Sequence, residues 1–453
     1  MRISTSQIYD AGSLNIQRNQ AALFKLQNQL STGRRVLTPE DDPVAAAQAL
    51  LVTQAKEMNT QQTTNQGTAE SQLGLVDSQL SSLVDLIQNV RDRVIQAGNT
   101  SLTASDRESI ATELEARFGE LLGLANAQNG SGDYLFSGYQ GATKPFAIDA
   151  SDSAVAYYGD DGERLLQVSS SRIMPVNVAG SDVFMNAKQG NGTFVVQTGG
   201  NTGGGINQGS ATVDAGSVLD LQKWQASVNL LPSDASSTPP VIPMLQIRFS
   251  SNAATGATEY QLFDATPATP VAVSNPAAYT SGMAIPLVTT AVAIPVPPLP
   301  AASTLPVGTD FGSQVVVQGK PAAGDTFEIQ PSGNQSLFQT VQSLIGALKT
   351  PIGTSSFTTS EYTNALGLQL TNLDRALDNV SSVQATVGTR LRELESLGDA
   401  ASDLDLQYQT SLSGLQDLDY AKAISEFTMQ QTFLEAAQKS FAQISGLSLF
   451  NYL

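Results

Sequence analysis

Few residues of this chain of 453 residues have side chains suited to catalysis or metal binding, because it contains no Cys and no His. A serine triad that depends on His, a Cys–His pair and the His- or Cys-based zinc motifs are therefore excluded. No disulfide can form either. We therefore expect a protein that is not an enzyme and that holds neither a cofactor nor a metal.

Clustered carboxylates and one glycine-rich segment are the remaining candidates for chemistry. Asp160, Asp161 and Glu163 offer oxygen ligands for a hard cation, but the flanking glycines favour a solvated hairpin turn. The acidic pair at 41–42 stands where the start of a helix favours negative charge, so capping explains it better than paired-acid chemistry. Residues 199–205 (GGNTGGG) lack the Lys-Ser or Lys-Thr of a phosphate loop and indicate a flexible loop.

The charge balance limits the classes of partner. Asp and Glu number 41 and Lys and Arg 23, which gives a net charge of -18. Such a chain is repelled by nucleic acid and by anionic lipid headgroups, so we expect neither a nucleic-acid nor a membrane partner. The apolar-looking run 284–300 contains five prolines and cannot be a spanning helix. The N-terminal residues lack the apolar core of a cleavable signal, so we expect either a cytosolic protein or export without cleavage.

Both ends of the chain show helical periodicity with a narrow apolar seam. Near the N-terminus, apolar residues recur every seven positions, at Tyr9, Ile16, Leu23 and Leu30. Gly33 is placed to end this helix, and Pro43 to start the next. Near the C-terminus a similar stripe comprises Ile424, Phe427, Leu434, Phe441 and Ile444. Helices with such seams cannot bury themselves, so we expect these nine residues to form an assembly seam that pairs the two ends and stacks them with other copies.

The segments next to the ends are also helical, and the middle is not. Apolar residues follow three- and four-residue steps over 73–94 and 366–394, and Ser105 is expected to begin another helix through a capping box. The segment 154–168 predicts a β-hairpin. From 186 onward the chain is rich in Gly, Thr, Val, Ala and Pro and carries strand-like pieces, which indicates one inserted β domain.

The predicted fold is mainly α: a long coiled-coil-like helical bundle formed by both chain ends, with an inserted β-rich domain. We expect terminal helices at 1–42 and 410–453 to form an inner assembly domain. A helical rod domain with a β-hairpin is expected at 43–185 and 326–409, and the outer β domain at 186–325.

Several motifs in this arrangement resemble a known family. Residues 30–36 (LSTGRRV) and 39–50 (PEDDPVAAAQAL) resemble flagellin-family N-termini, and the Asp-Asp-Pro form resembles the hook-associated protein 3 branch, which forms the hook–filament junction. Similar motifs are GDYLFSGYQ at 132–140, TKPF at 143–146, YGDDGER at 158–164, VAGSDVF at 178–184, NQSLFQTV at 334–341, VGTRL at 387–391, DYAKAISEF at 419–427, QQTFLEAAQKSF at 430–441 and LSLFNYL at 447–453. The segment 186–325 resembles nothing in that family.

The resemblance implies a structural subunit of the bacterial flagellum that forms the junction between hook and filament. It implies unfolded type III export without cleavage, a cytoplasmic export chaperone, and a ring of copies between hook-associated protein 1 and the flagellin filament. The location would then be extracellular. Two alternatives stay open: flagellin itself, or a flagellar scaffold whose outer domain binds carbohydrate or a host surface.

Overall fold

The chain divides into two compact units. The computed structural model describes residues 5–99, 101–149, 154–233, 241–267, 269–290, 305–354 and 357–446. The first unit comprises residues 1–68, 167–173 and 393–453, and the second comprises 69–166 and 174–392. Among the described residues, no helix combines the length and the apolar character needed to cross a membrane.

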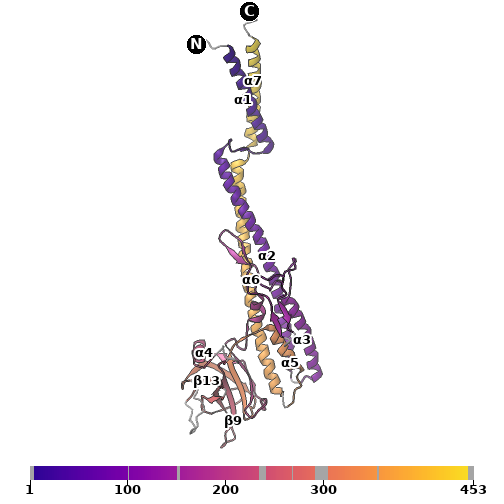
Figure 1. The fold of residues 1–453 in the computed structure, drawn as a ribbon, viewed down its shortest axis with the longest axis vertical. Coiled ribbons are helices and arrows are strands. Elements are labelled where there is room, and N and C mark those ends of the chain that lie inside the picture. The colour runs from indigo at the N-terminus through magenta and orange to yellow at the C-terminus, as the bar shows by residue number, and fades with distance from the viewer. Residues whose placement is uncertain are drawn as a thin grey trace, which may run out of the picture. The chain divides into compact units, whose positions relative to one another are not determined.

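The first unit is built from helices at the two ends of the chain. Helices α1 (Thr5–Thr32) and α7 (Tyr420–Gly446) lie side by side and run antiparallel (Figure 1). The unit also holds the first part of α2 (Pro43–Ala97) and the last part of α6 (Thr359–Gln416). Within it, the side-chain amide of Asn59 donates to the carbonyl of Ala401 at 2.8 Å.

The ends of these helices follow local chemistry and confirm two predictions. Gly33 has φ 71°, which favours glycine, and its N–H donates to the carbonyl of Gln29 at 2.8 Å to close α1. Pro43 is the first residue of α2, and Asp42 accepts the N–H of Ala45 at 3.0 Å as its cap.

The long helices of the second unit pack through stripes of buried apolar residues. It contains the rest of α2 and α6 with α3 (Ala104–Ala125) and α5 (Leu337–Lys349). The stripe predicted over 73–94 is almost completely buried, as Leu73, Leu80 and Val90 show, but it belongs to one continuous helix that begins at Pro43. The capping box lies two residues earlier than predicted, because Thr103 and Asp106 satisfy each other's backbone N–H groups.

Short strands follow α3, and they correct the predicted hairpin. They are β1 (Phe146–Ile148), β2 (Val155–Tyr157), β3 (Leu165–Gln167) and β4 (Ile173–Pro175), followed by a π-helical turn η1 (Ser181–Met185). The segment 154–168 is not a hairpin, because β2 pairs with β1 and β3 pairs with β4. The Asp160 carboxylate accepts the N–H groups of Tyr139 and Gly162, so the chain between β2 and β3 folds toward the 132–140 motif instead of turning back.

The inserted β domain confirms the predicted strand-rich middle. Its elements are β5 (Ala187–Lys188), β6 (Phe194–Asn201), β7 (Thr212–Val213), β8 (Ser217–Val218), α4 (Leu221–Val228), β9 (Leu245–Ser251), β10 (Thr258–Asp264), β11 (Val271–Ala272), β12 (Ala277–Ala278), β13 (Ala284–Val288), β14 (Asp310–Gln318), β15 (Asp325–Pro331) and β16 (Asn334–Gln335). One sheet has the order β11-β10-β9-β15-β6, and a second has β13-β14-β7.

A shared apolar core joins these two sheets. It contains Phe194, Trp224, Phe249, Phe311 and Phe327, all buried. Because β15 pairs with both β6 and β9, the strand-rich domain extends beyond residue 325. With helical ends and a β-rich middle, the predicted fold class is confirmed.

Candidate functional site

The candidate functional site is the pair formed by α1 and α7, with the segments that connect it to α2 and α6. The less exposed positions of both helices include a set that follows alternating three- and four-residue steps, as in a coiled coil. We call them the seam. On α1 they are Gly12, Ile16, Asn19, Leu23, Leu26 and Leu30; on α7 they are Ala423, Phe427, Gln430, Leu434, Ala437 and Phe441.

Aromatic packing closes the seam near the chain ends. The ring centroids of Tyr9 and Phe441 lie 4.9 Å apart. Gly12 allows this approach, because a Cβ atom on it would lie only 2.7 Å from Cδ2 of Phe441. One side of this contact is exposed to solvent, since Tyr9 is 56% exposed. Phe441 therefore packs against α1 at Gly12, where a larger residue would force the Phe441 ring or the helix to shift.

A polar pair interrupts the apolar seam at its middle. The side-chain amide of Gln430 donates to Oδ1 of Asn19 at 3.1 Å, and both residues are half-buried. A single polar pair inside such a seam disfavours other registers, because a shift would leave both groups unpaired. Sequence analysis missed this pair; the signal was two polar residues on the seven-residue pattern.

Two connecting segments, which we call the joint, hold this pair to α2 and α6. The joint comprises residues 33–42 and 417–419. Backbone hydrogen bonds link the first segment to the end of α6 and to the second segment. Arg35 N–H donates to the carbonyl of Gln416 at 2.7 Å, and Leu418 N–H donates to that of Gly33 at 2.9 Å. The Arg35 guanidinium also donates to the carbonyl of Leu415 at 2.8 Å, at the end of α6.

The charges of the joint connect its segments to α1 and α2. Arg35 pairs with Asp42 at 3.1 Å, while Lys25 of α1 pairs with Asp41 at 2.6 Å. The Lys25 hydrogen bond and the N–H of Thr38 lower the pKa of Asp41 to about 2. Asp42 therefore caps a helix as predicted, whereas Asp41 fastens the joint to α1.

The nine predicted seam residues are not all brought together. Tyr9, Ile16, Leu23 and Leu30 face α7, and Phe427, Leu434 and Phe441 face α1. Ile424 is 55% exposed and lies one residue beyond the seam position, which Ala423 occupies. The side chain of Ile444 lies outside the described residues. A role of these residues in assembly stays a prediction.

Large apolar side chains also point away from the seam. We call them the outer apolar residues. The term covers Leu14, Phe24, Ile424, Met429 and Phe433 on the terminal pair, together with Val44, Leu51 and Met58, which are spaced seven residues apart on the start of α2. Each of the eight is more than half exposed. These positions were not predicted from the sequence, although the seven-residue spacing on α2 could have indicated them.

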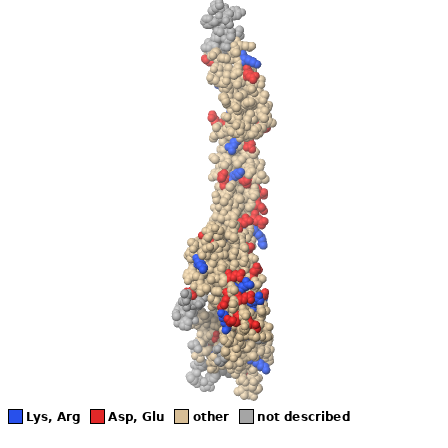
Figure 2. Space-filling model, turned by 90° about the vertical axis from the view of Figure 1, so that its right-hand side faces the viewer, with Lys and Arg blue, Asp and Glu red and all other residues tan. Residues whose placement is uncertain are grey.

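Charge is sparse on the same helices. Helix α1 has two basic residues and one acidic residue in 28, and α7 has two of each in 27. The two helices thus contribute a net charge of about +1 to a chain whose total is -18. Acidic side chains are prominent elsewhere, as Figure 2 shows for one face. Copies of this chain can therefore bring their terminal helices together with little like-charge repulsion.

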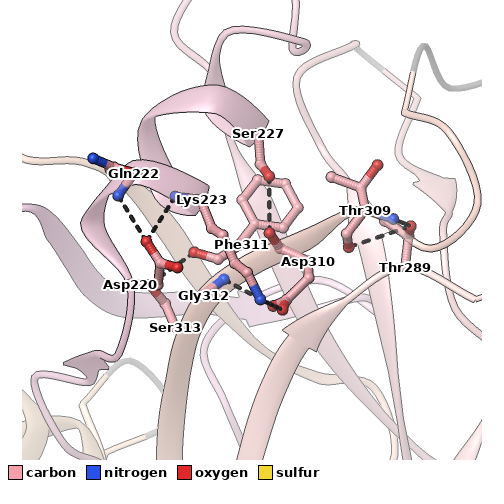
Figure 3. A network of polar contacts seen from close by, with 10 residues as sticks. All are labelled: Asp220, Gln222, Lys223, Ser227, Thr289, Thr309, Asp310, Phe311, Gly312 and Ser313. Carbon is pink, nitrogen blue, oxygen red and sulfur yellow. Dashed lines mark hydrogen bonds and ion pairs between the residues drawn. The ribbon is translucent and has the colours of Figure 1, made fainter.

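The other candidates for chemistry have structural partners. In the loop at 160–163, Asp160 binds backbone N–H groups, and within the described residues no acidic group has the arrangement of a metal site. In the β domain, Asp220 caps α4, and Lys223 pairs with Asp310 at 2.7 Å (Figure 3). The Lys223 hydrogen bond lowers the pKa of Asp310. This network fastens α4 to β14.

A groove of about 490 Å³ lies between β6, the β7 segment and α6. Its lining includes Gln197, Asp214, Asn364 and Gln369. The Asp214 carboxylate already accepts the N–H of Val316 at 2.8 Å. Asp214 is the one ionisable residue among the described residues that line the groove, and its hydrogen bond lies within the β domain.

Comparison with known proteins points to one family. The bacterial flagellin N-terminal helical region matches residues 3–141, and the flagellin C-terminal helical region matches residues 370–453. Flagellar hook-associated protein 3 of Escherichia coli K12 is 28% identical over 99% of both chains. The protein of the same name from Salmonella typhimurium LT2 is 26% identical over 99% of both chains.

A solved structure extends the similarity to the fold. The flagellar junction protein FlgL from Legionella pneumophila is 29% identical, with a TM-score of 0.64. The match covers 82% of this chain and 100% of the Legionella chain.

Proposed function

We propose that this chain, a structural subunit of the bacterial flagellum that belongs to the family of flagellar hook-associated protein 3, forms the junction between hook and filament. The terminal helices would assemble with other copies and with neighbouring flagellar subunits. The alternative that the outer domain binds carbohydrate or a host surface has no observation in its favour.

The observation that carries the proposal is the apolar, nearly uncharged surface of the terminal pair. Leu14 and Phe24 project from α1 and Phe433 projects from α7, each more than half exposed. Several large apolar side chains exposed on two helices that carry little charge are typical of an interaction surface. Because these side chains belong to both helices of the pair, we expect more than one neighbouring subunit to cover them, as in a ring of copies.

Flagellin is the weaker alternative. Flagellin-type regions match only the ends of the chain, at 3–141 and 370–453, whereas the similarity to hook-associated protein 3 runs through 99% of it. The β domain lies in the part that the flagellin regions leave out. A junction subunit is therefore the better account of the whole chain.

The partners of the junction follow from this proposal. Hook-associated protein 1 would contact the ring on the hook side, and flagellin on the filament side. Before export through the type III apparatus, the outer apolar residues would need cover, and a cytoplasmic chaperone that binds an amphipathic helix in a groove would supply it. No step in this sequence needs a catalytic residue, a metal or a cofactor.

A gene deletion in the parent bacterium tests the proposal. Cells that lack this chain are expected to keep their hooks, to lose attached filaments and to release flagellin into the medium. Complementation with the intact gene is the control. Filaments that stay attached without the chain would contradict a junction role, and hooks from which flagellin is neither assembled nor released would point to a role earlier in export.

A further inference from the structure

We propose that Met58 and Met429 are oxidation sites, and that their conversion to methionine sulfoxide stops the chain from assembling. This inference rests on the proposed function, because it requires the outer apolar residues to be buried between subunits. It adds a modification site and a sensitivity to peroxides that the junction role alone does not contain.

The first observation is which methionines are open to solvent. The chain has seven Met and no Cys, so its sulfur chemistry belongs to methionine alone. Met58 and Met429 are each 53% exposed, whereas Met174 is completely buried at 0%. Exposure governs how readily a thioether is oxidised.

The other described methionines are held within the second unit. Met185, Met244 and Met283 are each half-buried. The sulfur of Met244 accepts a hydrogen bond from the side-chain amide of Gln330 at 3.2 Å, and the sulfur of Met283 accepts one from the N–H of Thr280 at 3.3 Å. These side chains are less exposed to a dissolved oxidant than those of Met58 and Met429.

The second observation is where the two exposed methionines lie. Met58 continues the stripe of Val44 and Leu51 on α2, at the same seven-residue interval. Met429 lies one helical turn before Phe433 on α7, and both are outer apolar residues. Of the methionines in the described part of the chain, the two most exposed therefore belong to helical surfaces that assembly would cover.

The chemistry is an oxygen transfer from a peroxide. The thioether sulfur attacks one oxygen of hydrogen peroxide, the O–O bond breaks, a sulfur–oxygen bond forms, and water leaves. The sulfur is oxidised by two electrons, and the peroxide is reduced. The product is a polar side chain in place of a flexible apolar one. Burying that oxygen without a partner weakens binding by roughly tenfold or more at each site.

Assembly and oxidation then compete for the same side chains. A free copy exposes both sulfurs, while a copy within the junction covers them. We therefore expect oxidation to act on subunits that have left the cell and have not yet been incorporated. Once assembled, the junction should resist the same dose of peroxide.

The test uses the purified full-length chain, hydrogen peroxide, and hooks isolated from a strain that lacks this chain. Peptide mass spectrometry after a dose series should find sulfoxide at Met58 and Met429 well before Met174. Binding of the treated chain to the hooks should fall roughly tenfold or more for each of the two residues that is oxidised. The double variant Met58→Leu, Met429→Leu should bind before treatment and keep its binding after it, and Met58→Gln, Met429→Gln should bind weakly without any peroxide.

Three results would overturn the inference. Oxidation of Met174 as early as that of Met58 would show that exposure does not select the site. Full hook binding by chain oxidised at both residues would contradict the inference alone and leave the junction role intact. If the untreated chain and the Leu variant both fail to bind hooks, the proposed function is wrong, and this inference falls with it.

Discussion

Replacing Phe441 with Ala should open the terminal helix pair and prevent assembly. In a packed core, Phe→Ala costs about 3–5 kcal/mol. Phe441 is half-buried in the isolated chain, where its ring meets Tyr9 and Gly12. We therefore expect Phe441→Ala to destabilise the helix pair by roughly 2 kcal/mol, which is half of the cost in a packed core. That loss shifts the balance between the paired and the open state by about 30-fold.

The stability of the second unit should not change in this variant. Its core lies in other helices and in the β domain, so thermal unfolding of that unit should stay as in the parent chain. Hydrogen exchange at the amides of α1 should accelerate by about the same 30-fold, because isolated helices of this length are marginal in water. Binding to isolated hooks should be lost.

Lys439→Ala is the matched control on the same helix. Lys439 is exposed and lies two residues before Phe441. Its removal should leave exchange and hook binding unchanged, since single surface charges contribute little. If Phe441→Ala binds hooks normally while Lys439→Ala does not, charge rather than apolar packing holds the assembly, and this reasoning is refuted.

Three further predictions concern the joint and the β domain. Gly33→Ala should destabilise the joint by about 1–2 kcal/mol, since φ is 71° and a Cβ atom would lie 2.7 Å from the Tyr420 hydroxyl; hydrogen exchange of the joint amides measures this. Because the pKa of Asp41 falls from 3.8 to about 2, its pairing with Lys25 should stabilise the joint fully above pH 4 and be lost as the pH falls through about 2. An NMR titration of the joint checks this, and an Asp41 resonance that titrates near pH 4 would contradict it. Replacing residues 191–332 with an Asn-Gly turn should leave hook binding intact, since Gln189 N–H bonds to the carbonyl of Gly333 at 3.1 Å; a folded deletion protein that no longer binds hooks would show a role for the β domain in assembly.

Local patterns in the sequence predicted the helices and their ends. The seven-residue spacing placed Ile16, Leu23 and Leu30 among the less exposed positions of α1, while their role in assembly stays a prediction. Gly33 and Pro43 marked a helix end and a helix start, because each acts through its own backbone. Ile424 was assigned to the seam because it is large and apolar. The seam position is instead held by its small neighbour Ala423, which is buried.

Contacts between distant segments could not be predicted. Arg35 reaches the carbonyl of Leu415, 380 residues away, and nothing in the LSTGRRV motif reveals that partner. The false hairpin at 154–168 arose in the same way, because the Asp160 carboxylate binds the N–H of Tyr139 and so redirects the chain. In the β domain the strands were recognisable, but not the order that places β15 between β9 and β6.

The position of this chain along an isolated flagellum tests the central claim most directly. Antibodies against the β domain, coupled to gold particles, should label intact flagella of the parent bacterium at one place, where the hook meets the filament. Flagella from cells that lack the chain supply the background. A narrow band at that junction is the expected result, and gold along the whole filament would contradict the account and identify the chain as a filament subunit.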